Sequence, residues 1–486
     1  MTQFDKRNIS MMMDFYEMTM ANGYFVSGGQ NTRVAFDVFY RRNPDNGGFA
    51  IFAGLEQIIE YVESMHFDAD DVEYFRQQKI FSEDFLKYLS NFHFHGDIYA
   101  FPEGTIMYPN EPFLTVIADL IDAQLVETAI LSQVNHQSLI ATKASRIVRS
   151  ANGRFVSDFG ARRAHNMDAA TYGARAAFIG GVNGTATVSA GKMFEIPVNG
   201  TMAHSWVMYF GDEYDAFKRY AEVYPQAAIF LIDTYDVVHS GVPNAIRVAK
   251  EILEPAGNRL KGVRIDSGDL AYLSKRVRKM LDEAGLNDCK IIVSNSLDEF
   301  TITSLLNQGA AIDSFGVGER LITAKSEPVF GAVYKLVAIS DGEKFTPRIK
   351  ISENVEKITN PGLKNVYRIY DEGRHAVADM LALRDENIDL STPFRYIDPV
   401  KPWKQRAFTN CTAKSLLKLY VKDGRRVEEL PNLHEIKDYV KWQLENEIWV
   451  EEQRFENPHH HYLDMSPNYY ELKMNLIYKM RSKFNS

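Results

Sequence analysis

The first 120 residues alternate between helical and strand-like patterns of hydrophobic positions. Apolar residues at helical spacing predict helices over residues 11–27, 55–65 and 82–92, with Ser82 as the N-cap of the third. Alternation of apolar and polar positions predicts strands over residues 34–40, 49–52, 97–105 and 113–118. A turn rich in Asn, Pro, Asp and Gly at residues 43–48 separates the first two strands. This mixture indicates an α+β sandwich domain.

A different rhythm begins near residue 125, where short apolar runs recur, each followed by a turn and a helical segment. The runs cover residues 155–157, 177–179, 195–198, 227–232, 262–265, 290–293 and 311–315. Their spacing is typical of βα units, in which parallel strands are joined by crossover helices. Because no G-x-G-x-x-G turn follows the first strand, we expect an irregular parallel α/β barrel, similar to a TIM barrel, and not an open sheet.

Polar residues and glycines stand where these apolar runs end. They are Asp158, Asn183, Gly200, Thr201, Asp233, Asp266, Asn295, Gly316 and Gly318. Any one of them alone is best explained as a turn former or a helix cap. Barrel enzymes carry their chemistry at the carboxyl ends of the strands, so the recurrence at seven strand ends indicates an active site.

The last part of the chain changes character. Residues 330–338 and 345–351 predict a hairpin, and beyond residue 360 the chain becomes charged and aromatic. The run His459–His461 is interpreted as solvated, since no acidic or cysteine partner has metal-site spacing. The predicted domains are an N-terminal α+β domain over residues 1–125, an α/β barrel with the active site over residues 126–360, and an α+β appendage over residues 361–486 that packs on the other two.

Composition limits the class of partner. The 486 residues carry a formal net charge of −9 and no long basic run, which argues against nucleic acid as the main partner. No apolar run reaches the ~18 residues of a membrane helix, and the N-terminus lacks a signal-peptide core. The two cysteines, Cys289 and Cys411, form neither a disulfide framework nor a zinc-site spacing. We therefore expect a cytoplasmic protein that binds neither nucleic acid nor a membrane.

Residues 263–269 combine a cation, two carboxylates, a hydroxyl and a glycine in one short turn. Arg264 offers paired donors for a carboxylate or a phosphate. Asp266 and Asp269 offer oxygens for a sugar hydroxyl or a metal-bound phosphate. The segment therefore suits an anionic, phosphorylated substrate.

Two later segments suit phosphate. Gly316 and Gly318 allow backbone N–H groups to approach a phosphate closely, at the place where barrels usually bind one. Ser294 and Asn295 precede a helix, so they serve as a plain cap, as a phosphate site, or as both.

Two further segments contribute an aromatic ring, a cation and a histidine. Phe159 can stack on an aromatic ligand, and Arg162 and Arg163 stand at a helix start, which disfavours cations and so hints at an anionic ligand. His204 follows a predicted strand end, although a lone histidine is more often structural than catalytic.

The segments RIDSGDL (264–270), GTMAHSW (200–206) and FGVGERLIT (315–323) resemble the nicotinate phosphoribosyltransferases, which belong to the type II phosphoribosyltransferase family. The resemblance runs from Asp14 to about Leu336. It implies transfer of phosphoribosyl from 5-phosphoribosyl 1-diphosphate to nicotinate, giving nicotinate mononucleotide and diphosphate in NAD biosynthesis. It also implies ligase-type coupling to ATP hydrolysis, Mg²⁺ carried by the substrate diphosphate with unknown protein ligands, and a homodimer with shared active sites.

The resemblance also implies roles for individual residues. His204 is expected to be phosphorylated by ATP, with Asp266 and Asp269 as further catalytic residues. The expected nicotinate contacts are Tyr16, reaching into the partner subunit's site, with Phe159, Thr201 and Arg264. The expected phosphoribosyl diphosphate contacts are Arg41, Arg42, Arg162, Ser294, Asn295, Gly316, Gly318, Thr323 and Lys335.

One position bears on the choice of substrate. The related nicotinamide enzymes carry an aspartate in a GTDT segment, where this chain has Ala186 within Gly184-Thr185-Ala186-Thr187. Alanine removes an acceptor for the amide and a charge that would repel a carboxylate, which favours nicotinate by roughly several kcal/mol. The alternatives are transfer to nicotinamide or to quinolinate, or a non-catalytic barrel that binds phosphorylated metabolites.

Overall fold

The computed structural model describes residues 7–352, 354, 357–388, 394–399 and 401–484. The chain forms two compact units: the first comprises the described residues up to Leu139 and from Val329 onward, and the second runs from Ile140 to Pro328. The first unit thus groups segments from the predicted N-terminal domain and the predicted C-terminal appendage. The boundaries between the two units differ from the predicted domain boundaries at 125/126 and 360/361.

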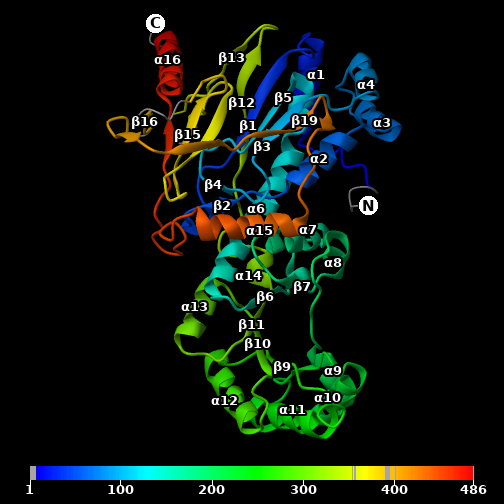
Figure 1. The fold of residues 1–486 in the computed structure, drawn as a ribbon. Helices are drawn as coiled ribbons and strands as arrows, with labels where there is room; N and C mark the ends of the chain where they lie inside the picture. The colour runs from blue at the N-terminus through cyan, green and yellow to red at the C-terminus, as the bar shows by residue number, and fades with distance from the viewer. Residues whose placement is uncertain (1–6, 353, 355–356, 389–393, 400, 485–486) are drawn as a thin grey trace. The chain divides into compact units, whose positions relative to one another are not determined.

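The first unit is built on a seven-stranded antiparallel sheet with the order β13-β12-β1-β5-β3-β19-β20 (Figure 1). Its strands are β1 (Arg33–Phe39), β3 (Asp97–Ala100), β5 (Leu114–Asp119), β12 (Val333–Ser340), β13 (Phe345–Pro347), β19 (Lys418–Lys422) and β20 (Arg425–Arg426). The predicted hairpin is confirmed as β12 and β13, and it belongs here because β12 pairs with β1. Ala35, Ile117 and Val337 form part of the buried core that this pairing creates.

A second sheet of the same unit has the order β17-β16-β21-β15-β14-β18. Its strands are β14 (Lys364–Tyr370), β15 (Ala376–Leu383), β16 (Phe394–Ile397), β17 (Gln405–Phe408), β18 (Thr412–Ser415) and β21 (Leu463–Met465). Next to it His461 is buried and ion-paired, so the interpretation of the histidine run as solvated is wrong for this residue. One charged partner, Asp379, is distant from His461 in the sequence. The other, Glu452, is nearer, but its spacing from His461 does not mark it as a partner.

The remaining elements of the first unit are mostly helices. They are α1 (Phe15–Val26), α2 (Leu55–Ser64), α3 (Ala69–Gln77), α4 (Glu83–Leu89), α5 (Leu120–Leu125), α6 (Glu127–Ser150), in which the unit boundary falls, α15 (Leu433–Asn446), α16 (Pro467–Phe484), and the short pair β2 (Ala50–Ile51) and β4 (Ile106–Met107). Ser82 caps α4 as predicted, since its side chain accepts from the N–H of Phe85. In the predicted turn at 43–48, Asp45 and Asn46 adopt positive φ, which these residue types tolerate better than most. Among the described residues no helix is both long and apolar enough to cross a membrane.

The second unit contains a six-stranded parallel sheet with the order β7-β6-β11-β10-β9-β8. Its strands are β6 (Phe155–Asp158), β7 (Gly184–Thr185), β8 (Ile229–Leu231), β9 (Gly262–Ile265), β10 (Lys290–Ser294) and β11 (Ser314–Val317). Because β6 pairs with β11, the order is that of a closed ring interrupted only between β7 and β8. The predicted irregular α/β barrel is confirmed in this form.

Helices follow the strands of the second unit, as βα units require (Figure 1). They are the 3-10 helix η3 (Ala161–Arg163), α7 (Met167–Ile179), α8 (Val188–Phe194), α9 (His204–Phe210), α10 (Glu213–Val223), the π-helices η4 (Val237–Gly241) and η5 (Ala249–Leu253), α11 (Val242–Val248), α12 (Leu270–Glu283), α13 (Glu299–Asn307) and α14 (Glu319–Ile322). The strand predicted over residues 177–179 is wrong, because these residues end α7, and a short apolar run does not distinguish a buried helix from a strand. The strand predicted over 195–198 is reduced to one parallel bridge between Thr185 and Val198, at the gap in the ring.

Candidate active site

Arg264 occupies the centre of a polar network at the carboxyl ends of the parallel strands. On β9, Val263 and Ile265 point into the core, so the side chain between them points to the opposite face. Its guanidinium donates from Nε to Ser294 Oγ (2.9 Å), from Nη1 to Thr201 Oγ1 (3.1 Å) and from Nη2 to Asp266 Oδ1 (3.0 Å). The end of β10, the turn after β9 and the loop before α9 therefore hold the cation in one orientation.

Asp266 joins this network from the turn after β9. Its Oδ1 also accepts from the hydroxyl of Ser294, and its N–H donates to Asp233 Oδ2 (2.8 Å). The hydroxyl of Ser267 donates to the same Asp233 oxygen (2.7 Å). The other carboxylate oxygen of Asp266, Oδ2, lies 4.0 Å from Nε2 of His204. The turn thus presents one oxygen to the arginine and one to the histidine.

His204 is the first residue of α9 and is partly exposed, with 42% of its side chain accessible. Its Nδ1 lies 3.1 Å from Oγ1 of Thr234, which follows β8 in sequence. The imidazole is therefore held between a hydroxyl on one side and a carboxylate on the other, with room for a ligand.

A cavity of about 180 Å³ opens next to Arg264. Its lining consists of Phe159, Arg162, Arg163, Arg264, Asp266, Ser294, Asn295, Ser296, Gly316, Gly318 and Glu319. Three arginines and several hydroxyl or amide groups face two carboxylates, so the cavity is polar and net positive. Such a lining suits a phosphorylated ligand.

A second cavity of about 230 Å³ shares Phe159, Arg162 and Arg264 with the first. Its remaining lining is small or apolar: Ala161, Ala186, Gly200, Thr201, Met202 and Ala203. The Cζ of Arg264 lies 5.3 Å from the centre of the Phe159 ring. The cavity therefore combines an aromatic ring, a fixed cation and small side chains, which suits a flat aromatic anion.

Phe159 is positioned by its neighbours in the two adjacent strands. A Cβ at Gly316 would lie 2.4 Å from the Phe159 ring, so only glycine leaves space for the ring there. The buried Asp158, which precedes Phe159 in the chain, accepts hydrogen bonds from Thr185 Oγ1 (2.7 Å) and from the N–H of Gly160 (2.8 Å). Burial raises the pKa of Asp158, and these two donors oppose the rise. Asp158 therefore supports the turn that carries Phe159.

Most of the residues proposed from the sequence for the second unit lie together. The two cavities are lined by Phe159, Arg162, Thr201, Arg264, Asp266, Ser294, Asn295, Gly316 and Gly318. His204 adjoins them through Asp266.

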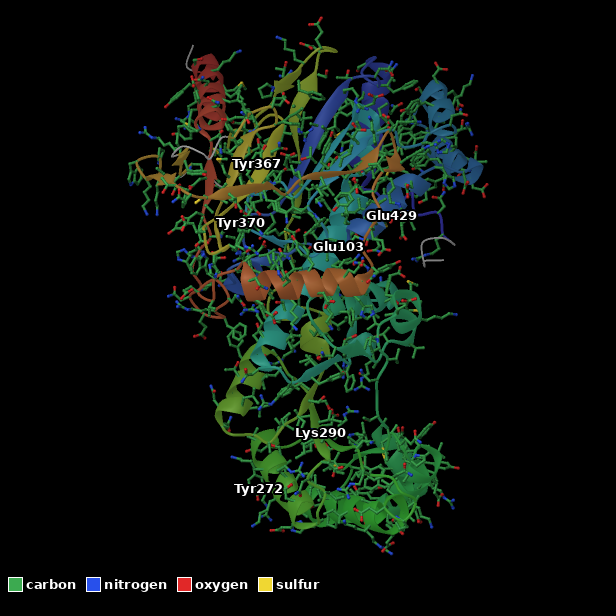
Figure 2. All side chains as sticks on the ribbon, in the orientation of Figure 1. Glu103, Tyr272, Lys290, Tyr367, Tyr370 and Glu429 are labelled. Atoms are coloured by element: carbon green, nitrogen blue, oxygen red, sulfur yellow. The ribbon has the colours of Figure 1, made fainter. Side chains whose placement is uncertain are left out.

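Asp269 and Thr323 do not line either cavity and make local hydrogen bonds, so the roles proposed for them stay predictions. The Asp269 carboxylate caps α12 by accepting from the N–H of Tyr272 (3.0 Å), whose ring is labelled in Figure 2. The hydroxyl of Thr323 donates to the carbonyl of Glu319 (2.7 Å).

The segment after β10 resolves the choice between a cap and a ligand site. Asp298 is the N-cap of α13, since its side chain accepts from the N–H of Thr301 (2.8 Å). Ser294 and Asn295 face the first cavity instead. The helix after Gly318, α14, spans only Glu319–Ile322, so its dipole contributes little to anion binding.

Tyr16, Arg41, Arg42 and Lys335 belong to the first unit. Tyr16 is 44% exposed on α1, and burial followed by the charge of Glu127 raises its pKa. On β12, burial lowers the pKa of Lys335, the charge of Glu127 opposes this, and the charges of Arg41 and Lys350 add to it. The charge of Glu127 thus acts on both Tyr16 and Lys335, and that of Arg41 acts on Lys335, while the roles proposed for all four residues stay predictions.

Several residues of the site were not selected from the sequence. Ser296 and Glu319 line the first cavity, and each is adjacent to a residue that was selected. Thr234 has no local signal at all, because its partner His204 is 30 positions away. Within the described ranges, no group of three or more His, Cys, Asp or Glu side chains is placed to hold a metal ion.

Comparison with known proteins agrees with this geometry. Three family models match consecutive parts of the chain: the nicotinate phosphoribosyltransferase N-terminal domain over residues 11–135, the nicotinate phosphoribosyltransferase family over 155–371, and the corresponding C-terminal domain over 363–473. Nicotinate phosphoribosyltransferase of Bacillus subtilis (strain 168) is 46% identical, over 99% of this chain and 97% of the relative. The enzyme of Caenorhabditis elegans is 34% identical, over 95% and 92%.

A solved structure supports the same assignment. The crystal structure of human nicotinic acid phosphoribosyltransferase matches with a TM-score of 0.84 at 27% identity, covering 96% of this chain and all of that one. A nicotinate-nucleotide pyrophosphorylase from Pyrococcus furiosus matches with a TM-score of 0.70 at 26% identity, over 92% and 97%. The family models, the full-length relatives and the cavities around Arg264 lead to one conclusion: the chain is an enzyme of the nicotinate phosphoribosyltransferase family.

Proposed function

We propose that this chain transfers the phosphoribosyl group of 5-phosphoribosyl 1-diphosphate to nicotinate, as an entry step from nicotinate to NAD. The observation that carries the proposal is the position of Arg264. Its guanidinium forms part of the wall of both cavities, and three hydrogen bonds hold it there. One cation thereby adjoins an aromatic pocket and a phosphate pocket.

The second cavity is assigned to nicotinate. The pyridine ring stacks against Phe159, and its carboxylate takes donors from Arg264 and Thr201. Ala186 supports the acid as substrate, since its methyl group lines this cavity and offers no acceptor to an amide. Among the described residues no carboxylate side chain lines the second cavity, so nicotinate meets no charge of its own sign from them.

The first cavity is assigned to the phosphoribosyl diphosphate. Arg162 and Arg163 neutralise phosphate oxygens, while the side-chain amide of Asn295 donates to them and Ser294 keeps Arg264 and Asp266 in place beside them. The carboxylate of Asp266 faces the same space and can accept from ribose hydroxyls. Positioning and charge stabilisation then supply the catalysis.

In the transfer step, the bond from C1 of the ribose to the diphosphate oxygen breaks, and its electron pair leaves with the diphosphate. The lone pair of the pyridine nitrogen forms the new bond to C1. Positive charge develops on the sugar and negative charge on the leaving group, where the arginines stabilise it. Because the pyridine nitrogen is unprotonated at neutral pH, the step needs no general base.

We propose that Mg²⁺ arrives with the substrate diphosphate. The carboxylates at the site fit an oxygen-liganded cation: in the described part of the chain, Asp233 Oδ1 is buried without a hydrogen-bond partner. Asp266 and Asp233 are the residues that would hold the ion, and when bound it would supply positive charge beside the diphosphate.

We propose that ATP hydrolysis drives the reaction through phosphorylation of His204. The imidazole is partly exposed, and its Nε2 faces the Asp266 carboxylate next to the phosphate cavity. The resemblance to the family and this geometry support the same assignment. We further propose a cytoplasmic homodimer in which Tyr16, Arg41, Arg42 and Lys335 complete the partner's site.

The test is turnover of the purified protein with nicotinate or nicotinamide, each with 5-phosphoribosyl 1-diphosphate and Mg²⁺, with and without ATP. We expect nicotinate mononucleotide, formed faster with ATP. In His204→Ala we expect the slow ATP-free transfer to persist, while nicotinate-stimulated ATP hydrolysis is lost. Stimulated hydrolysis that survives in His204→Ala would exclude this residue as the phosphoacceptor.

Other outcomes separate the alternatives. A preference for nicotinamide would contradict the role given to Ala186. Product formed only from quinolinate would reassign the second cavity to a dicarboxylate. Tight binding of phosphoribosyl diphosphate without turnover on any base would indicate a non-catalytic phosphometabolite-binding barrel.

A further inference from the structure

The orientation of the His204 side chain must be restrained by a contact with a neighbouring residue. It stands at the first residue of α9, is 42% accessible, and its Nε2 is 4.0 Å from Asp266 Oδ2, which is longer than a hydrogen bond. An accessible imidazole samples several rotamers unless a partner restrains it. The ring has one close hydrogen-bond partner among the described residues, the hydroxyl of Thr234 at 3.1 Å from Nδ1.

Thr234 is itself firmly placed. The N–H of Ile232, two residues earlier, donates to the carbonyl of Arg264 (3.1 Å), which continues the pairing of β8 with β9. The next residue, Asp233, accepts from the N–H of Asp266 (2.8 Å) and from the hydroxyl of Ser267 (2.7 Å). A threonine side chain has few χ1 choices because it is β-branched. The hydroxyl therefore stands on a backbone that is tied to the same turn as Asp266.

We infer that Thr234 is a positioning residue for the ATP half-reaction. Its hydroxyl accepts a hydrogen bond from Nδ1–H of His204 in the tautomer that carries the lone pair on Nε2, and this bond keeps Nε2 directed towards Asp266. The inference rests on the proposed phosphorylation of His204 and adds the residue that prepares it.

The chemistry requires this tautomer. In the phosphorylation step the Nε2 lone pair forms a bond to the γ-phosphorus of ATP, the bond from that phosphorus to the bridging oxygen breaks, and its electron pair leaves with ADP. Nδ1 keeps its proton throughout. With the other tautomer the proton would sit on Nε2, and the attack would first need a proton transfer.

The segment Asp233-Thr234 thereby links two parts of the site. Asp233 holds the turn that carries Asp266, and Thr234 holds the histidine that Asp266 faces. Neither residue lines the cavity assigned to nicotinate. Removal of the Thr234 hydroxyl should therefore affect phosphorylation of His204 and not the binding of nicotinate.

The experiment compares Thr234→Val, which keeps the shape but lacks the hydroxyl, with Thr234→Ser, which keeps the hydroxyl. Thr303→Val is the matched control, since Thr303 loses an equivalent hydroxyl bond to the carbonyl of Glu299 (2.7 Å) on α13, away from His204. For each purified full chain, the rate of His204 labelling by γ-labelled ATP, the ATP consumed per nucleotide formed, the KM for nicotinate and the thermal unfolding midpoint are measured.

We expect labelling in Thr234→Val to slow by roughly tenfold, as for the loss of one orienting hydrogen bond with misplacement of the ring. We expect Thr234→Ser to label within about twofold of the original chain, because it restores the bond. The KM for nicotinate and the unfolding midpoint should stay unchanged in both, and Thr303→Val should label normally.

The contrary outcomes are distinct. Normal labelling in Thr234→Val, or equally poor labelling in Thr234→Ser, would overturn the inference while leaving the proposed function intact. Slow labelling that is accompanied by a lowered unfolding midpoint and a raised nicotinate KM would assign Thr234 a structural role only. An original chain that takes no label from ATP would overturn the proposed ATP coupling and this inference together.

Discussion

Two of the arginine–aspartate pairs in this protein are alike in chemistry and opposite in surroundings. In the first unit, Arg368 donates to Asp379 with bonds of 2.9 and 2.7 Å, and both side chains are at most 1% exposed. In the second unit, Arg264 donates to Asp266 at 3.0 Å, with exposures of 11% and 27%. Comparing the two pairs distinguishes a polar network that stabilises the fold from one that can bind a ligand.

The buried network closes on itself. Arg368 also donates to the carbonyl of Ile106 (2.8 Å), and His461 lies 3.6 Å from Asp379 and 3.0 Å from Glu452. The hydroxyl of Tyr108 donates to the second oxygen of Glu452 (2.7 Å). Burial alone would raise the pKa of Asp379, but the charge of Arg368 acts together with the hydrogen bond to Glu111 and the contact with His461, and their sum lowers this pKa. The charges are thus paired inside the protein, as buried ions require.

The network around Arg264 stays open. Its guanidinium is fixed by Ser294, Thr201 and Asp266, yet it still forms part of the wall of two cavities. Charges that are held by protein partners but remain accessible can exchange water for a ligand at little cost in reorganisation. A polar network whose groups are all buried and paired within the protein is therefore structural. A polar network whose groups remain accessible from a cavity can bind a ligand.

The largest expected effect is on the closed network. Arg368→Met should lower the free energy of unfolding by about 3–5 kcal/mol, because it leaves Asp379 buried without its main partner. Urea unfolding measures this loss. A loss below about 1 kcal/mol would show that the buried pair contributes no more than a surface pair and would remove the contrast.

The next effect concerns the open network. Arg264→Ala should raise the KM for nicotinate by roughly 10- to 100-fold, the worth of a charge-assisted hydrogen bond. The free energy of unfolding should change by less than about 1 kcal/mol, since the side chain is not closed into the core. Steady-state kinetics and urea unfolding of the same preparation test both halves. An unchanged KM would contradict the carboxylate assignment, and severe unfolding would place Arg264 among the structural residues.

The third prediction concerns pH. Burial alone would lower the pKa of His461, but the negative charges of Asp379 and Glu452 outweigh it, so this pKa lies above its ordinary value of 6.5. The contribution of His461 to stability is therefore complete below pH 6.5 and is lost as pH rises through the raised pKa, by at most ~1.4 kcal/mol per pH unit. We expect His461→Gln to flatten the fall in unfolding free energy between pH 6.5 and 8.5.

The pH comparison has its own control. Burial and the charge of Asp379 raise the pKa of Glu111, so the free energy of unfolding also falls with rising pH because of Glu111. This fall occurs in the original chain and in His461→Gln alike. The difference between the two stability curves therefore isolates His461. Parallel stability curves for the two chains would show that His461 does not titrate in the folded state over this range.

The smallest expected effect tests whether Asp269 belongs to the open network around Arg264. Asp269, which the resemblance suggested as catalytic, caps α12. Asp269→Ala should cost about 1 kcal/mol of stability and Asp269→Asn only a few tenths, while kcat/KM stays within about twofold in both. A large loss of kcat/KM in the stable Asn variant would return Asp269 to the catalytic residues.

Some elements could be predicted from the sequence and others could not, for physical reasons. The strand over residues 262–265 was predicted with its observed bounds, because its alternation and flanking turn are local properties. Residues 177–179 were assigned to a strand although they end α7, because three apolar residues carry no period of their own. The helix α3 was not predicted, since its charged sequence shows little apolar periodicity.

The sequence by itself determined the alternation of strands and helices in the second unit, the polar residues at the strand ends, and the motifs around Arg264, His204 and Gly316. Only the tertiary structure decided that β12 joins the sheet of β1, that His461 is buried with Asp379, and that Thr234 lies against His204. Local periodicity reports which face of an element is apolar. It carries no information on which distant residue will meet that face, because such contacts form only when the chain closes loops of many residues.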